Sequence, residues 1–505
     1  MASSEQPSLD TARHIRYWQR CFRSVLPHHY VSNDSIRLTL GFFIISALDL
    51  LSSSSSYSEP PSDPLKASLI TPDDRTRMRA WVLSLQHPQG GFCGSPHHVL
   101  PDRYRFKTDL WAKTESARDP ANANLAATYF ALLLLGILAE DDGSKAFEGV
   151  HRYKTLTWLK TLQREDGSFG ELIDENGYVG GGRDMRYCYL AATIRWALGG
   201  EAEAGGDFDV DALVAHIRRG QTFDGCISES STHESHAGYA YCAVAALSLL
   251  DLANPNAATE PDRYLHAGIP SIPSLVHFLA ARQFDYLSPS SDDENAEDEE
   301  YHALPDLSTL VLSDDPQIAG FNGRLNKVAD SCYTWWVSGT LAILGESSVV
   351  DGAPARKFII EKTQHIIGGF AKHPGGPPDV YHAYLGLAAL ATIAGAEGGK
   401  EEGLGKFDPR LCLGVEAAGR LAKAREALLY PEEESEESED EEFAEYTAKL
   451  NENLKRILGD TMERKERFHA QCVARGLDPA VEMHKHKWNW FHPFDLDETA
   501  FKDEV

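Results

Sequence analysis

An aspartate and a cysteine stand two positions apart in this chain, Asp330 and Cys332, and a histidine, His382, follows further along. A carboxylate oxygen, a thiolate sulfur and an imidazole nitrogen, with a fourth position left open, form the ligand set of a catalytic rather than a structural zinc ion. Taken alone, an Asp-x-Cys pair is better explained by a helix cap followed by a buried cysteine, and it is the neighbouring residues that favour a metal site. The three residues are therefore a candidate metal site with an alternative structural explanation.

Charged and hydroxyl-bearing residues surround this pair in the sequence. Arg324 and Lys327, three positions apart, could bind one anion such as a phosphate, although a solvated basic turn has the same pattern. Tyr333 directly follows Cys332, and His236 opens another apolar stretch from which it could donate to the same anion. A lone histidine in such a position also fits a purely structural role.

The spacing of Asp330 and Cys332 restricts where they can share a ligand. Residues two apart point to different sides of an α-helix, so both can face one metal only where a helix begins. Asp330 is a good N-cap, and the apolar run 333–344 follows it. A cysteine at a helix N-terminus is also biased towards the thiolate. The sequence therefore predicts a metal site at the start of a helix.

A short phrase recurs along the chain, in which a helix ends at a glutamine and a glycine turn with an apolar residue follows. Between the copies lie apolar helices rich in small residues, expected at 125–138, 187–198, 238–250, 333–344 and 382–393. Such periodicity predicts an all-α protein of repeated helix pairs, with strand signals nearly absent. The pattern leaves open whether the pairs form an open solenoid or close into an α–α barrel. The copies pair Gln86 with Phe92, Gln163 with Phe169, Gln221 with Ile227, Gln283 with Phe321 and Gln364 with Phe370.

Closure would bring the charges at the helix starts, including Arg186, to one mouth of the barrel. Aromatic residues on the same helices would then line an apolar cavity, although each alone is equally explained as core. These residues are Tyr129, Tyr189, Tyr239 and Trp336. Taken together, a zinc ion, an anion site and an apolar pocket suggest that a thiol attacks an apolar substrate with a phosphate leaving group.

Composition restricts the class of protein. The chain has 505 residues, 42% of them hydrophobic, and a formal charge of −28, which argues against a nucleic-acid partner. Eight scattered cysteines without a Cys-x-x-Cys pair fit reduced thiols. The apolar stretch 125–138 is too short to cross a bilayer, and no secretory signal is visible. We expect a soluble cytoplasmic protein without an integral membrane segment.

The domain organisation follows from the same composition. Residues 1–430 are expected to form the barrel, interrupted by a Ser/Pro loop at 52–64 and an acidic insertion at 286–304. Residues 431–505 are expected to form an acidic linker and a charged helical C-terminal extension. Both acidic runs have the composition of solvated, disordered chain.

The phrase Gly-Phe-Asn-Gly-Arg-Leu-Asn-Lys at 320–327, followed by Asp330-x-Cys332-Tyr333, closely resembles the β subunits of protein prenyltransferases, above all of the type I geranylgeranyl enzymes. The resemblance runs from Arg13 to about Ile393. It implies an α–α barrel, one zinc ion held by Asp330, Cys332 and His382, and an obligate α subunit. It also implies a diphosphate site made by His236, Arg324, Lys327 and Tyr333.

Other positions bear on the subtype that this resemblance implies. Thr39 stands where farnesyl enzymes place a bulky tryptophan, and Leu385 replaces an aromatic residue that also limits pocket depth. Lys372 stands where farnesyl enzymes have a magnesium-binding aspartate, so we expect no Mg²⁺ requirement. Arg186, in Asp184-Met185-Arg186, also resembles type I enzymes. These positions favour a twenty-carbon over a fifteen-carbon donor.

The implied activity is zinc-dependent transfer of geranylgeranyl from geranylgeranyl diphosphate to a C-terminal CaaX cysteine, with X often Leu or Phe, in small GTPase-type proteins. Two departures from the family pattern are Ala237, which replaces a glycine, and Asn124, which replaces a histidine near the peptide's last residue. The alternatives are a farnesyltransferase β subunit and a non-catalytic helical scaffold. A triterpene-type cyclase would need an acidic Asp-x-Asp-Asp motif, and similar text occurs only in the acidic insertion.

Overall fold

The computed structural model describes residues 8–52, 69–96, 122–140, 143–174, 177–203, 207–286 and 317–430. Helices dominate this part of the chain, as predicted. They are α1 (Thr11–Arg23), α2 (Arg37–Ser52), α3 (Pro72–Ser84), α4 (Leu125–Leu138), α5 (Arg152–Thr161), α6 (Met185–Leu198), α7 (Val210–Arg219), α8 (Ala237–Leu252), α9 (Arg263–Gly268), α10 (Ile272–Ala280), α11 (Ser331–Leu344), α12 (Gly352–Lys357), α13 (Val380–Ala396) and α14 (Val415–Leu429). Shorter turns of helix are η1 (His28–Ile36), η3 (Gly200–Ala202), η4 (Ser347–Val349) and the π-helix η5 (Phe358–Thr363).

Three two-stranded antiparallel sheets also occur, which differs from the expected near absence of strands. Their strands are β1 (Leu172–Ile173) with β2 (Val179–Gly180), β3 (Gln283–Asp285) with β4 (Ala319–Phe321), and β5 (Phe407–Asp408) with β6 (Leu413–Gly414). Each strand has two or three residues, too few to produce the alternating pattern by which strands are recognised in a sequence.

The recurring glutamine phrase has one structure in all its copies. In each, the backbone of the glutamine pairs in antiparallel register with the buried apolar residue that ends the phrase, as between Gln163 and Phe169. The fourth copy pairs Gln283 with Phe321 across β3 and β4, although an insertion separates them in the sequence. The phrase therefore reverses the chain between an outer and an inner helix, through a tight turn in every copy except the fourth, where the insertion takes its place.

The glycine of this turn is required for two reasons, as Gly167 and Gly368 illustrate. Their φ angles are +83° and +89°, in the left-handed region that favours glycine. A Cβ atom at Gly167 would also lie 1.9 Å from the carbonyl oxygen of Ala212, and one at Gly368 would lie 2.5 Å from that of Arg13. Both carbonyls belong to the first turn of the next outer helix. The glycine thus allows neighbouring repeats to approach closely.

The glutamine side chain joins each repeat to the next. Its Oε1 accepts the backbone N–H of the residue that caps the following outer helix, as at Gln163 with Asp209, 2.8 Å. The same contact joins Gln86 to His151, Gln221 to Ser271 and Gln283 to Asp351. In the last copy Gln364 accepts the N–H of Asp10, 3.0 Å, at the cap of α1. The last repeat is therefore joined to the first.

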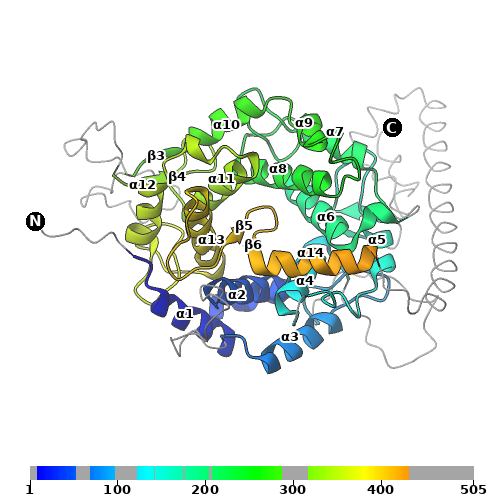
Figure 1. Ribbon diagram of the computed structural model, residues 1–505, viewed down its shortest axis with the longest axis horizontal. Helices are drawn as coiled ribbons and strands as arrows, with labels where there is room; N and C mark the ends of the chain where they lie inside the picture. Colours follow the sequence, from blue (N-terminus) through cyan, green and yellow to red (C-terminus); the bar gives the residue numbers. More distant parts are fainter. Residues whose placement is uncertain are drawn as a thin grey trace, which may run out of the picture.

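The inner helices close into a ring (Figure 1). α2, α4, α6, α8, α11 and α13 contact one another in this order, and α13 contacts α2. The outer helices α1, α3, α5, α7, α10 and α12 pack around them. The predicted α–α barrel is confirmed, and the open solenoid is excluded. Inner helices such as α4, with 12 buried residues, are apolar on all sides because both faces are covered.

The inner helices begin at one end of the ring. Backbone hydrogen bonds join the start of an inner helix to the loop that precedes the next one, such as Leu125 N to Glu171 O, 2.8 Å, and Ala237 N to Gly323 O, 2.8 Å. Ser331 N likewise donates to Lys372 O, 3.0 Å. We call this end the rim. Helix N-termini carry positive partial charge, so the rim is suited to an anion.

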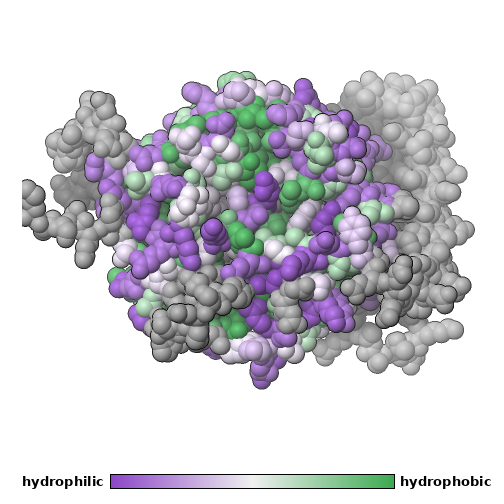
Figure 2. All heavy atoms as spheres, viewed as in Figure 1, coloured by the Kyte–Doolittle hydropathy of each residue, from purple (hydrophilic) through white to green (hydrophobic). Residues whose placement is uncertain are grey.

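The β5–β6 hairpin lies within the outline of the ring and leads into α14, which runs against α4 and α6 (Figure 1). Arg420 of α14 pairs with the buried Asp49 of α2, 3.1 Å, and donates to the carbonyl of Gly136 at the end of α4, 3.0 Å. Atoms fill the centre of the ring in the space-filling view of this face (Figure 2). The ring is therefore closed at its centre on this side.

Several sequence expectations fall partly or wholly outside the described residues. These are most of the Ser/Pro loop 52–64, most of the acidic insertion 286–304 and the extension 431–505. Within the described ranges, one helical stretch, Ser32–Ser52, is long and apolar enough to cross a membrane by length and composition, a stretch that the sequence analysis did not single out. Of its most apolar window, 56% is buried, and it contributes the inner helix α2.

Replacing Gln364 with leucine tests whether its contact closes the ring. The change removes the acceptor of the Asp10 N–H and of the buried His14 ring, 3.1 Å, so we expect a loss of about 1–3 kcal/mol in unfolding free energy. Amide hydrogen exchange in α1 should accelerate. Gln283→Leu, whose equivalent bonds to Asp351 are solvent-exposed, is the matched control and should lose less. Equal losses, or unchanged protection of α1, would contradict the closure role.

Candidate metal centre

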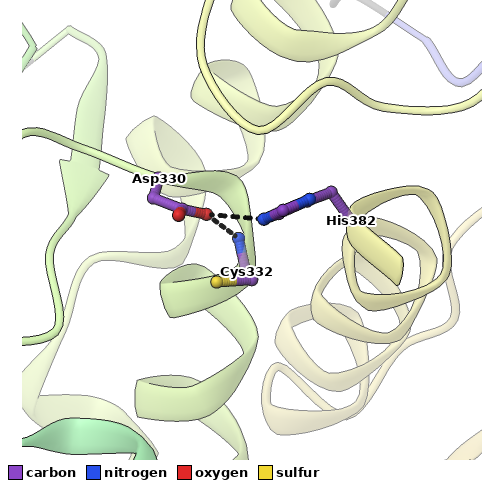
Figure 3. A group of neighbouring side chains, drawn as sticks. All are labelled: Asp330, Cys332 and His382. Atoms are coloured by element: carbon purple, nitrogen blue, oxygen red, sulfur yellow. Dashed lines mark hydrogen bonds and ion pairs between the residues drawn. The ribbon is translucent and has the colours of Figure 1, made fainter. Parts of the chain in front are cut away.

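Two neighbouring inner helices present the predicted metal ligands at their first turns (Figure 3). Asp330 is the N-cap of α11, and its carboxylate accepts the backbone N–H of Cys332, 2.8 Å. His382 is the third residue of α13. The predicted helix start at Asp330 is therefore present. Its non-helical backbone, with φ −137° and ψ 132°, lets the carboxylate turn to the same side as the thiol.

The ligand atoms of Asp330, Cys332 and His382 lie within 4.8 Å of one another. His382 Nε2 lies 3.5 Å from Asp330 Oδ1. Asp330 and Cys332 are buried, and His382 is nearly so, with 13% of its side chain exposed. A tetrahedral zinc ion with bonds of about 2.0–2.3 Å requires ligand atoms at roughly this separation after a small inward movement. The sequence alternative of an isolated cap and a buried cysteine leaves the approach of His382 unexplained.

A second carboxylate orients the histidine. Asp379, the N-cap of α13, accepts from His382 Nδ1 at 2.6 Å, and its other oxygen accepts the backbone N–H groups of Tyr381 and His382, both at 2.9 Å. The Nδ1 proton is thereby assigned, and Nε2 is directed towards Asp330. A carboxylate bound to the far nitrogen is the usual support of a metal-binding histidine.

The protonation states of the three residues fit a cation site. Burial lowers the pKa of His382, but its hydrogen bonds to Asp330 and Asp379 outweigh burial and raise the pKa to about 9. Burial raises the pKa of Asp330, but the hydrogen bond and charge of His382 and the hydrogen bonds to Cys332 together outweigh burial and leave the carboxyl pKa below its ordinary value. Burial and the charge of Asp330 raise the pKa of the Cys332 thiol well above its ordinary value. A thiolate at this position would therefore require a bound cation.

Beside the cluster, Tyr333 and His236 form a hydrogen-bonded pair, with 2.9 Å between the hydroxyl oxygen and Nε2. His236 is the N-cap of α8, and its Nδ1 accepts the N–H of Gly238, 3.0 Å. Burial and then the nearby Arg324 lower the pKa of His236 to about 4, so the ring is neutral and its proton lies on Nε2. His236 therefore donates to Tyr333, which leaves the hydroxyl proton of Tyr333 for another acceptor.

The loop that carries the predicted anion ligands packs against this pair. A Cβ atom at Gly323 would lie 2.2 Å from the Tyr333 ring, so a glycine is needed there. The side chain of Arg324 is 41% exposed and pairs with that of Glu234. The sequence analysis did not identify Glu234. Lys327 is exposed on the same loop. The structure thus places Arg324 near His236 and Tyr333 at the rim. The exposed Lys327 still fits the alternative of a solvated basic turn.

Two further predicted residues lie at the rim. Arg186 follows the N-cap Asp184 of α6, pairs with its carboxylate at 2.8 Å, and lies 6.0 Å from the ring centre of Tyr239. The carbonyl of Lys372 accepts the N–H of Ser331, and this places the Lys372 backbone directly beside the metal cluster.

The predicted pocket residues form three pairs. Tyr239 and Trp336 are half-buried, and Trp336 donates to the hydroxyl of Tyr381, 3.2 Å. Tyr129 and Tyr189 are almost fully buried and bond to each other at 3.1 Å. Thr39, in the first turn of α2, is half-buried, and Leu385, in α13, is buried. Asn124, the departure noted above, is the N-cap of α4.

The Asp-x-x-His spacing of Asp379 and His382 is visible in the sequence and favours a metal site, but sequence reasoning assigned no role to Asp379 and missed Tyr381. The i, i+3 spacing at a helix start is that of a side-chain contact, which the bond from His382 to Asp379 shows. Tyr381 gives no comparable signal, because its contact with Trp336 joins two helices that the sequence does not place side by side.

Known proteins resemble this chain in both fold and sequence. Residues 9–413 match the model of the prenyltransferase alpha-alpha toroid domain. This chain belongs to that family of prenyltransferases. The resemblance found in the sequence motifs is thereby confirmed.

Three similar proteins are informative. The geranylgeranyl transferase type-1 subunit beta of Arabidopsis thaliana is 28% identical over 420 residues, which cover 82% of this chain and 92% of the relative. The protein of the same name from Dictyostelium discoideum is 26% identical and covers 80% and 95%, respectively. The structure of Candida albicans protein geranylgeranyltransferase-I complexed with GGPP matches with a TM-score of 0.60 and 25% identity, over 83% of this chain and 99% of that chain.

Changing Asp379 to asparagine tests its support of His382. Asparagine still caps a helix but carries no charge, so we expect zinc affinity to fall about 10- to 100-fold. Cys332→Ala should lower the affinity further, because it removes a ligand. The measurement is competition for zinc with a chelating dye, and Asp209→Asn, the same change at the cap of α7, is the control. Unchanged affinity in Asp379→Asn would contradict the orienting role.

Proposed function

We propose that the chain is the catalytic β subunit of a cytoplasmic protein geranylgeranyltransferase type I. It transfers a twenty-carbon geranylgeranyl group from its diphosphate to the cysteine thiol of a C-terminal CaaX motif, with X often Leu or Phe, in small GTPase-type proteins. The observation that carries this proposal is the cluster of Asp330, Cys332 and His382 at the rim of a closed, aromatic ring. The names of the similar proteins support the subtype and the need for an α subunit.

Asp330, Cys332 and His382 would hold one zinc ion. When bound there, zinc would lower the pKa of an acceptor thiol that reaches its open position, so that the sulfur is a thiolate at neutral pH. Asp379 orients the histidine for this purpose. Asp330 and Cys332 are buried, which would limit the access of bulk water to the nucleophile.

The reaction is a substitution at the first carbon of the donor chain. The acceptor sulfur forms a bond to this carbon, the bond from the carbon to the diphosphate oxygen breaks, and its electron pair leaves with the diphosphate. The acceptor thiol gives up its proton to solvent. Negative charge therefore develops on the leaving oxygen, and cationic and hydroxyl groups near it accelerate the step.

The residues around His236 fit this role. Tyr333, which accepts from His236, can direct its own hydroxyl proton to the leaving oxygen. Arg324 would exchange Glu234 for the diphosphate, and Lys327 lies three residues further on the same loop. Lys372 would supply a fixed positive charge in place of a magnesium ion, so we propose that transfer needs no Mg²⁺.

Positions in the ring support a twenty-carbon donor. Thr39 and Leu385 are small or aliphatic where the farnesyl enzymes carry larger aromatic residues, so space remains for one more isoprene unit. Arg186, Tyr239 and Trp336 would contact the donor chain or the peptide near the rim, with Tyr129 and Tyr189 deeper. The second candidate, a farnesyltransferase β subunit, would require a shorter pocket than these positions suggest.

The test is prenyl transfer by the chain co-expressed with a prenyltransferase α subunit. We expect transfer of geranylgeranyl, in preference to farnesyl, to a peptide ending in Cys-a-a-Leu, with zinc and without magnesium. Cys332→Ala should reduce transfer to background, and Cys21→Ala, a half-buried thiol of α1, should not. A farnesyl preference with magnesium dependence would contradict the subtype. No transfer from either donor by a zinc-loaded heterodimer would favour the non-catalytic scaffold.

Thr39→Trp should shift donor choice towards farnesyl. An indole at this half-buried position would occupy space needed by the longer chain, and overpacking of this kind costs about 1–3 kcal/mol. We expect the ratio of kcat/KM for farnesyl over geranylgeranyl diphosphate to rise about tenfold or more. Thr76→Trp, on the exposed face of α3, is the control. An unchanged ratio would contradict the placement of Thr39 in the donor pocket.

A further inference from the structure

At the rim, a backbone hydrogen bond that recurs around the ring joins the start of one inner helix to the loop before the next. The first or second N–H group of the helix donates to a carbonyl of that loop, at 2.8–3.0 Å. The first N–H groups of a helix have no acceptor inside the helix, so each must find one elsewhere. The donor and acceptor pairs are Leu38 and Gly94 at α2, Leu125 and Glu171 at α4, Ala237 and Gly323 at α8, and Ser331 and Lys372 at α11.

The contact at α13 differs from these four, because its acceptor is a side chain. The N–H of Val380, the first residue of α13, donates to the hydroxyl oxygen of Tyr30 at 3.1 Å. Tyr30 lies in η1, within the loop that precedes α2, so this bond spans the point where the ring closes. At the rim, the last inner helix is therefore joined to the first through one hydroxyl group.

Both partners of this bond are held on their own sides. Asp34, also in η1, accepts from the hydroxyl of Ser95 at 2.9 Å, which ties η1 to the loop before α4. Val380 is 2% exposed, so its N–H cannot turn to solvent for another acceptor. Removing the Tyr30 hydroxyl would leave a buried N–H group unpaired in the first turn of α13.

The first turn of α13 also carries the support of the metal cluster. Asp379 accepts the N–H groups of Tyr381 and His382 and orients the His382 ring through Nδ1. Tyr30 and Asp379 thus take the first three N–H groups of the helix between them. A shift of this turn would move both the histidine ring and the carboxylate that orients it.

We propose that Tyr30 is a positioning residue for the metal centre. By accepting the Val380 N–H across the closure of the ring, its hydroxyl holds the first turn of α13 so that His382 meets Asp330. The inference rests on the part of the proposed function that assigns zinc to Asp330, Cys332 and His382, and it is independent of the transfer reaction. The closure of the ring and the geometry of the metal site are therefore coupled.

The experiment compares the parent heterodimer with Tyr30→Phe, which deletes the hydroxyl and keeps the aromatic ring. The first measurement, which needs no metal, is hydrogen exchange at the Val380 amide, followed by mass spectrometry. The second is zinc affinity by competition with a chelating dye. The third is the visible absorption of Co²⁺ bound in place of zinc, which reports the arrangement of its ligands. Tyr241→Phe is the matched control, because it deletes a hydroxyl bonded to the backbone of Pro409, 2.8 Å.

We expect Tyr30→Phe to speed exchange at Val380 and to weaken zinc binding, each about 2- to 10-fold, the factor equivalent to one lost hydrogen bond. The Co²⁺ spectrum should change as well. Tyr241→Phe should alter none of the three measurements. Adding Tyr30→Phe to Asp379→Asn should weaken zinc binding little further, since both residues act through the same turn.

Faster exchange at Val380 with unchanged zinc affinity and an unchanged Co²⁺ spectrum would overturn the positioning role. Unchanged exchange would overturn the closing bond itself. Full additivity of Tyr30→Phe and Asp379→Asn would overturn the route through the first turn of α13. Failure of the parent heterodimer to bind zinc would overturn the assigned zinc site and the positioning role with it, while exchange at Val380 would still report on the closing bond.

Discussion

The hydrogen bond from a helix cap to the glutamine of the preceding repeat is the contact on which the ring depends. It aligns each outer helix with its neighbour, and the glycine beside it allows the two backbones to approach to van der Waals distance. When Gln364 makes the same bond to Asp10, the repeats become a closed ring whose ends support each other. Closure gives every inner helix two inner neighbours, which is why α4 can be apolar on all sides without exposing that surface.

Closure also explains why the chemistry lies where it does. Because the inner helices begin at the same rim, the N-caps of five of them place polar side chains above helix ends that carry positive partial charge. These N-caps are Asn124, Asp184, His236, Asp330 and Asp379. Asp330 and Asp379 each cap a helix and at the same time belong to the metal cluster, one as a ligand candidate and one as the support of His382. An aspartate that both caps a helix and belongs to the cluster is held in place by the backbone N–H groups that it accepts. The cluster therefore needs few additional contacts to position these carboxylates.

The sequence predicted the repeated helix pairs and the helix start at Asp330 because the signals for these features are local. The glutamine and glycine phrase, the cap at Asp330 and the apolar runs each lie within a few residues, and the prediction of an α–α barrel followed once the family resemblance was added. Ring closure was not decidable from periodicity, since Gln364 and Asp10 are far apart in the chain. The ties from Tyr189 and Tyr384 to the hairpin were equally invisible, because a buried tyrosine has the same pattern whether its hydroxyl meets a backbone carbonyl or lines a cavity.

The distribution of polar atoms within the ring argues for the direction in which a donor would bind. Within the ring, the hydroxyls of Tyr189, Tyr241 and Tyr384 are used by hairpin carbonyls, and the indole of Trp336 is bonded to Tyr381. What these side chains present to the interior is therefore ring surface, which favours hydrocarbon over any charged group. Arg324, His236 and Tyr333 lie together at the rim, where the helix ends add positive potential. On the proposed function, an amphiphilic diphosphate would satisfy both regions with its head at the rim and its chain inside, and its reactive carbon would then lie on the side of the ring where the metal cluster is.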